Sequence, residues 1–182
     1  MAIIKTKKKW YSIVSPMFNN AIIGETLGYE PKDLENRKLD INFMSITNDP
    51  KNQNTKILFR VNGVKDNNVI VDVMGCGLTL SYVKRLIRKD ANKVVDSFNY
   101  ITKDDVKVIV KPLLITRFKT NKGVLNNLRK TTRSFLTEEI KKYDYNDFIK
   151  AVVSNYIQKA LRERLKKIYP LISCEFRIIK RI

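Results

Sequence analysis

The sequence contains no histidine, and only two of its 182 residues are cysteine. Histidine is the commonest general base and the commonest metal ligand of proteins, so its absence removes the simplest catalytic and metal-binding arrangements. Cys76 and Cys174 lie far apart in the chain, and two lone cysteines make no zinc site. We expect both to be small buried hydrophobic side chains without a disulfide, as is usual in a reducing compartment.

Acidic residues are scarce relative to basic ones. The chain has 36 Lys and Arg against 18 Asp and Glu, which gives a formal net charge of +18. A charge of this size costs self-repulsion unless a polyanion neutralises it. We therefore expect nucleic acid as the first candidate partner, and an anionic membrane surface as the second.

Long hydrophobic runs are also missing. No apolar stretch approaches the roughly 20 residues that a helix needs to span a bilayer. The lysines near the N-terminus are not followed by a long apolar segment, and neither end carries a lipidation motif. We therefore expect no membrane partner and no secretory signal, and we expect a cytoplasmic protein.

Hydrophobic periodicity predicts the fold class. Period-two alternation indicates strands near residues 11–14, 38–46, 56–61, 69–73, 97–101, 106–110 and 171–182. The 3.6-residue period indicates helices at about 80–89, from 122, from 145, and up to about 168. Strands followed by helices are typical of an α+β fold, here a mostly antiparallel sheet or partial β-barrel with three to four helices, clustered towards the C-terminus. We expect a basic tail over residues 1–9 and a single domain over residues 10–182.

Several local signals refine this prediction. The segment 25–37 reads as an acidic loop, and Asn146 is a candidate helix N-cap. Pro112 should end regular strand pairing, or mark a bulge or an edge of the sheet. The glycines of GCGLT, residues 75–79, should bend a connection from strand to helix. In the last strand, alternation places Cys174, Phe176 and Ile178 on one face.

Basic residues gather in a few segments. Residues 117–137 hold six cations and no acid, whereas a solvated helix usually interleaves both signs. Such clusters are typical of phosphate binding, which is blind to sequence and weakens with salt. The predicted RNA-binding residues are Lys5, Lys7, Lys8, Lys9 and Trp10; Lys84, Arg85, Arg88 and Lys89; and Arg117, Lys119, Lys122, Arg129, Lys130 and Arg133. For the cations at 162–167 a structural role is nearly as well favoured, because cations suit a helix C-terminus.

Two aromatic residues follow the N-terminal lysines directly. Trp10, the only tryptophan, and Tyr11 could either stack on unpaired bases or anchor the tail in the core. The alternation of Tyr11 with Ile13 favours anchoring.

A search for catalytic residues finds no convincing set. GCGLT lacks the Lys-Ser/Thr of a phosphate-binding loop, and Asp104 and Asp105 occupy a predicted hairpin turn, where Asp is common. No group of acidic residues has the spacing of a nuclease metal site. We predict no catalytic residue, no bound metal and no cofactor.

Six segments nevertheless resemble one known family, the small-ribosomal-subunit proteins called "S three a" or "S one e". They follow one another in register over nearly the whole chain: KKKWYSIVSPMFN, IIGETLG, GLTLSYVKRLIRK, YITKDDVKVIV, ITRFKTNKGVLNNLRKTTRSF and KIYPLISCEFRIIKRI. The end at Ile182, without a longer basic tail, resembles the archaeal type.

The resemblance implies a structural protein of the small subunit's platform, near the mRNA exit. Its partners would be small-subunit rRNA, neighbouring ribosomal proteins of the platform, and mRNA near the exit. The resemblance carries this role onto Lys8, Lys9 and Trp10; Arg85 and Arg88; and Arg129, Lys130 and Arg133. Two alternatives stay open: an RNA-modifying or RNA-cleaving enzyme, and an adaptor whose basic face meets an acidic protein.

Overall fold

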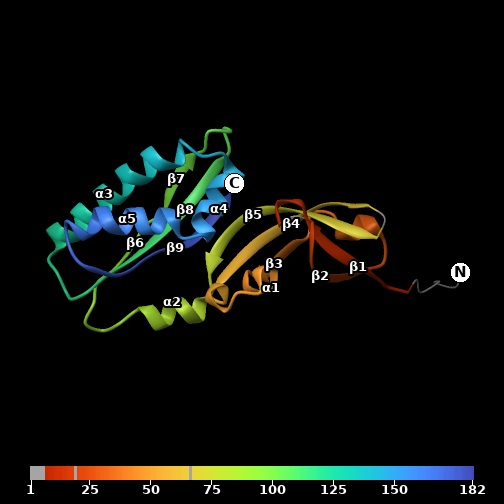
Figure 1. Ribbon diagram of the computed structural model, residues 1–182, viewed down its shortest axis with the longest axis horizontal. Helices are drawn as coiled ribbons and strands as arrows, with labels where there is room; N and C mark the ends of the chain where they lie inside the picture. The colour runs from red at the N-terminus through yellow and green to blue at the C-terminus, as the bar shows by residue number, and fades with distance from the viewer. Residues whose placement is uncertain (1–6, 19, 66) are drawn as a thin grey trace, which may run out of the picture. The chain divides into compact units, whose positions relative to one another are not determined.

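The structure, a computed structural model, describes residues 7–18, 20–65 and 67–182 (Figure 1). The chain divides into two compact units, residues 1–74 and 75–182, and the boundary falls inside strand β5 (Asn68–Leu78). Two compact units can belong to one folding domain, so the single domain expected from residue 10 stays a prediction.

The first unit is built from strands. They are β1 (Lys9–Ser15), β2 (Ala21–Gly28), β3 (Lys38–Asn42), β4 (Thr55–Lys65) and the first residues of β5. β1 pairs antiparallel with β2 and parallel with β5, while β4 pairs with β3 and β5. Short helical turns connect them: η1 (Pro16–Phe18), η2 (Pro31–Leu34), α1 (Met44–Thr47) and η3 (Pro50–Asn52). Apolar side chains at alternating positions of these strands fill the core of the unit. The ring centroids of Phe18 and Phe43 lie 6.0 Å apart there.

Two expectations for this unit were partly wrong. The predicted acidic loop over residues 25–37 begins later, because Glu25, Thr26 and Leu27 pair with β1 and extend β2 to Gly28. The strand predicted over 38–46 ends at Asn42, and α1 begins two residues later, at Met44. In both places the end of the strand is decided by pairing with another strand, which the local sequence pattern does not predict.

The second unit combines an antiparallel sheet with four helices. Its strands are β6 (Lys93–Val95), β7 (Phe98–Ile101), β8 (Lys107–Thr116), β9 (Leu171–Arg181) and the end of β5. β9 lies between β5 and β8, and both β6 and β7 pair with β8. The helices are α2 (Leu80–Leu86), α3 (Lys122–Ile140), α4 (Tyr145–Val153) and α5 (Tyr156–Lys166). Asp144 occupies the N-cap position of α4, without a capping hydrogen bond from its side chain, so the predicted cap at Asn146 was wrong.

Helices cover both faces of this sheet. Leu113 and Ile115 of β8 pack against Val83 of α2. Leu114 between them points to the opposite face and is also buried, and there α3 lies along β7 and α5 along β9 (Figure 1). The α+β prediction is therefore confirmed. The described part of the chain holds five α-helices where three to four were expected, and the short α1 makes the fifth.

The pairing of β9 contains a bulge that changes which residues are buried. Pro112 pairs with Phe176 and Lys111 with Ile178, so Arg177 is an extra residue on β9. The bulge at Pro112 is as expected, but it reverses the alternation that follows. Ile179 is therefore fully buried in place of Ile178.

Close approach of β5 to β9 explains the two glycines of GCGLT. Gly75 and Gly77 lie within β5, so they do not bend a connection to α2 as expected. A Cβ atom at Gly75 would clash with the main-chain oxygen of Ile179, because the two strands are hydrogen-bonded there. Between these glycines Cys76 is buried, as is Cys174, and both thiols are free as predicted. Burial raises the pKa of each thiol to about 12.

Candidate nucleic-acid interface

The N-terminal aromatics serve two different roles. Tyr11 is 3% exposed and packs in the core of the first unit, whereas Trp10 is 65% exposed. Successive side chains of a strand point to opposite faces, so Tyr11 anchors β1 and Trp10 faces solvent. Anchoring is therefore confirmed for Tyr11, and stacking on unpaired bases stays a prediction for Trp10 alone.

The lysines around Trp10 lie at the surface. Lys7 and Lys8 precede β1, Lys9 begins it, and all three are exposed. The ammonium of Lys8 lies 5.1 Å from the centre of the Tyr29 ring, a cation–π contact that holds it beside the end of β2. Lys5 was also predicted to bind RNA, and it lies outside the described residues.

The cations of α2 and its C-terminal extension are exposed. Lys84 and Arg85 stand on the last turn, and the Arg85 guanidinium lies 5.5 Å from the Tyr82 ring. The helix is shorter than expected and ends at Leu86, so Arg88 and Lys89 lie in the segment that follows it.

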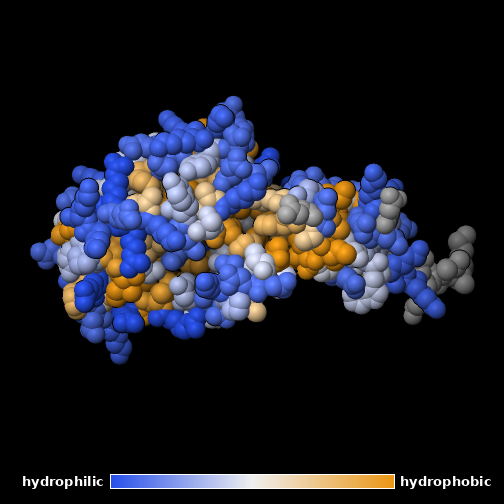
Figure 2. Space-filling view, in the orientation of Figure 1, coloured by the Kyte–Doolittle hydropathy of each residue, from blue (hydrophilic) through white to orange (hydrophobic). Residues whose placement is uncertain are grey.

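Helix α3 presents a basic face over β7. Its buried stripe includes Leu128 and Phe135, while Lys122, Lys130 and the arginines are exposed. Arg129 Nε lies 3.2 Å from Asp96 Oδ1, and the Arg133 guanidinium lies 6.0 Å from the Phe98 ring. Figure 2 shows hydrophilic residues along the outer side of this helix.

Hydrogen bonds bring two basic segments of the second unit together. Asn92 exchanges bonds with Thr116, whose N–H donates to the Asn92 oxygen at 3.0 Å. The Asn92 side chain accepts from the Thr120 N–H at 2.7 Å. The segment carrying Arg88 and Lys89 is therefore fixed beside the loop 117–121, which leads into α3.

The end of α5 joins the same place. The N–H of Arg117 donates to the Pro170 oxygen at 3.0 Å, close after Lys166 and Lys167, which are exposed. We call this collection of exposed cations the basic end. It comprises Arg88, Lys89, Arg117, Lys119, Lys122, Lys166 and Lys167.

Lys166 and Lys167 were not among the predicted site residues. The other two cations of the 162–167 segment are structural: Arg162 donates to the Leu171 and Ile172 oxygens, and Arg164 pairs with Glu138 at 3.2 Å. The excess of cations over residues 162–167 was visible in the sequence. It could not show which of these cations are bonded within the protein and which are exposed.

The described cations of the basic end and of α3 are, with one exception, not neutralised by an acid. In the part of the chain that the structure describes, Arg129 is the one cation of the basic end and of α3 that forms an ion pair. The positive charge of the basic end and of α3 is therefore available to an external anion.

The described residues contain no group of three or more Cys, Asp or Glu side chains placed to hold a metal ion. None of the helices that these residues form combines the length and hydropathy that crossing a bilayer requires.

Comparison with known proteins agrees with the sequence resemblance. The model of the Ribosomal S3Ae family matches residues 5–182. The chain is 29% identical to the small ribosomal subunit protein eS1 of Nanoarchaeum equitans, over 90% of this chain and 83% of that protein. It is 28% identical to eS1 of Staphylothermus marinus, over 90% and 78%, and 29% identical to eS1 of Natronomonas pharaonis, over 92% and 82%. The chain therefore belongs to the Ribosomal S3Ae family, in its archaeal type.

Proposed function

We propose that this ribosomal protein binds small-subunit rRNA through the basic end, the exposed face of α3 and the N-terminal segment around Trp10. Membership of the Ribosomal S3Ae family gives it a structural role in the small ribosomal subunit. We place it at the platform near the mRNA exit, beside neighbouring ribosomal proteins and within reach of mRNA. It works on the ribosome, in the cytoplasm.

One observation carries this proposal. The loop 117–121 and α3 hold six cations, of which Arg129 alone has an ion pair within the described chain. Each cation that meets a phosphate releases a condensed counterion, which contributes affinity without reading sequence. The fixed loop and the rigid helix hold these charges at set positions, which favours a folded RNA surface over a flexible polyanion.

A charge-reversal experiment tests the proposal. We expect Arg129→Glu, Lys130→Glu and Arg133→Glu together to weaken binding of small-subunit rRNA fragments in a filter or anisotropy assay. The slope of log K against log salt should fall in magnitude by about 2 to 3, if each side chain meets one phosphate. The corresponding Gln variant avoids repulsion between residue 129 and Asp96 and should show the same change of slope.

A matched control variant carries the same change of charge on the first unit, away from the proposed interface. Lys38, Lys51 and Lys56 are exposed lysines of the first unit that we do not assign to the interface. Replacing these three lysines by Glu should lower the affinity for RNA only through the change of net charge. The slope of log K against log salt should stay close to that of the parent protein. Equal losses in the two triple variants, with far-UV circular dichroism unchanged, would contradict the proposed face.

The alternative of an RNA-modifying or RNA-cleaving enzyme has no support from the comparisons, because the relatives are named ribosomal proteins. No observation favours the adaptor that meets an acidic protein.

A further inference from the structure

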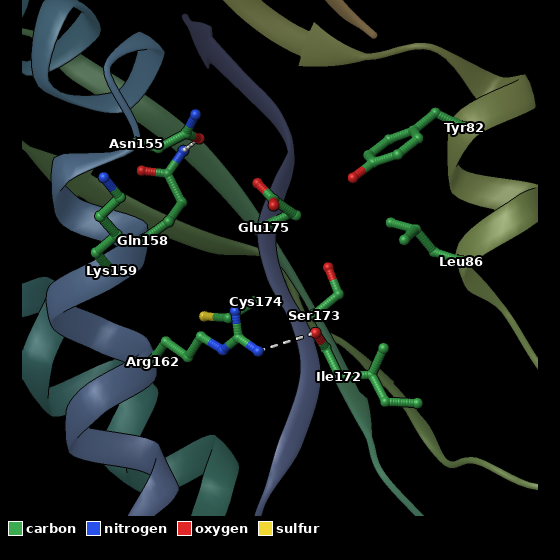
Figure 3. Close-up of a pocket in the computed structure, with 10 residues that line it drawn as sticks. All are labelled: Tyr82, Leu86, Asn155, Gln158, Lys159, Arg162, Ile172, Ser173, Cys174 and Glu175. Carbon is green, nitrogen blue, oxygen red and sulfur yellow. Dashed lines mark hydrogen bonds between the residues drawn. The ribbon is translucent and has the colours of Figure 1, made fainter. Parts of the chain in front are cut away.

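The second unit contains a pocket of about 370 Å³ that the proposed interface does not use (Figure 3). It lies at the edge of β9 between α2 and α5. β5 pairs with β9 at residues 178–180, and the chain turns away into α2 before it reaches residues 172–175. The edge of β9 therefore forms the floor, with Tyr82 on one side and Gln158 on the other.

The floor carries a carboxylate. The main chain of Glu175 pairs with Leu113 of β8, but its side chain makes no hydrogen bond and no ion pair with any residue that the structure describes. Its surroundings are partly dry, and burial raises its pKa to about 6 although the charge of Arg162 acts in the opposite direction. An acceptor that is withdrawn from water without a donor costs stability, so this one is suited to a donor supplied from outside.

A second acceptor in the same lining is also unsatisfied. Gln158 is 7% exposed, and its Oε1 has no partner in the described chain. Its Nε2 donates to the Val152 oxygen at 2.8 Å and to Asn155 Oδ1 at 3.2 Å, which holds the amide in place. The lining thus holds two acceptor groups, the Glu175 carboxylate and Gln158 Oε1, that have no hydrogen-bond donor in the described chain.

The other lining groups indicate what kind of molecule brings the donors. Figure 3 shows the hydroxyl of Tyr82 pointing toward Glu175 from α2, with no hydrogen bond between them. The Tyr82 ring is a flat surface on which a base can stack. Lys159 and Arg162 line the same pocket, so a phosphate beside it is favoured and a cationic side chain of another protein is disfavoured.

Among the bases, guanine matches these groups best. Its Watson–Crick edge presents two adjacent N–H donors, which a carboxylate accepts with its two oxygens. Adenine and cytosine present one amino group beside an acceptor, and uracil presents one N–H between two carbonyl oxygens that a carboxylate repels. We propose that this pocket binds an unpaired guanosine of RNA, with Glu175 accepting hydrogen bonds from N1–H and N2–H of the base. The inference rests on the proposed function, because it requires RNA at the protein surface.

Defined RNA oligomers test the pocket with the full chain. The probes are ten-nucleotide oligouridylates with one central guanosine, adenosine or inosine, titrated at a salt concentration that suppresses non-specific binding. We expect the guanosine oligomer to bind on the order of tenfold tighter than the adenosine oligomer, as a bidentate base contact gives. Inosine keeps N1–H and lacks the amino group, so it should fall between them.

Substitutions show whether Glu175 is responsible. Glu175→Gln should abolish the guanosine preference, while Glu163→Gln, at an exposed position of α5, should keep it. If Glu175→Gln fails to fold by circular dichroism, Tyr82→Leu takes its place and should reduce the guanosine preference through lost stacking.

The outcomes separate the two proposals. Absence of binding to every oligomer and to rRNA fragments would refute the proposed function. Binding with equal affinity for guanosine and adenosine, or a preference that survives Glu175→Gln, would overturn the inference and leave the function standing. Binding of a tetralysine peptide that depends on Glu175 would also overturn it, in favour of a protein partner.

Discussion

The carboxyl group of Glu175 should make the free protein less stable at neutral pH than at acidic pH. Burial raises its pKa from the ordinary value of 4.5 to about 6, and unfolding restores the ordinary value. A carboxyl with a raised pKa in the folded state favours folding below pH 4.5, and this contribution is lost as the pH rises through about 6. At about 1.4 kcal/mol per pKa unit, the difference amounts to roughly 2 kcal/mol at pH 7.5.

Glu175→Gln should therefore stabilise the protein by roughly 2 kcal/mol at pH 7.5 and by little at pH 4, because Gln removes the ionisation but keeps the shape. Urea unfolding followed by far-UV circular dichroism measures this, since α2 to α5 all belong to the second unit. Glu163→Gln is the matched control, because it removes the same charge from an exposed position. Equal gains in both variants at pH 7.5 would show that relief of net charge, and not burial of Glu175, is the cause.

Two other substitutions test the packing of β5 and the exposed tryptophan. Gly75→Ala should destabilise the second unit by about 2 kcal/mol or more, because its Cβ meets the Ile179 oxygen, and the drop should be visible in the same urea titration. Gly24→Ala, where a Cβ has open space, should change stability by less than about 1 kcal/mol; similar losses in both would refute the close-approach argument. Trp10→Ala should weaken binding to single-stranded RNA by about 1 to 3 kcal/mol with little change in stability, and in the parent protein RNA should quench the fluorescence of this sole tryptophan. Unchanged affinity together with unquenched fluorescence would remove Trp10 from the interface.

Local patterns predicted most of the elements. The hairpin of β4 and β5, the hairpin of β7 and β8, and the long helix α3 all follow from alternation or from the 3.6-residue period. β6 was missed because three residues are too short to show alternation. The burial of Ile179 was missed because the bulge at Arg177 depends on the register of β9 against β8.

The amino-acid sequence alone determined the excess of positive charge, the run of cations from Arg117 to Arg133 and the membership of the family, because these are properties of composition and order. Only the tertiary structure decided which charges come together. Lys89, Arg117 and Lys167 reach one end of the second unit through hydrogen bonds of Asn92 and Pro170, which join segments distant in the chain. Glu175 looks like any strand residue in the sequence, and its carboxyl group is partly buried because α2 and α5 both approach the edge of β9.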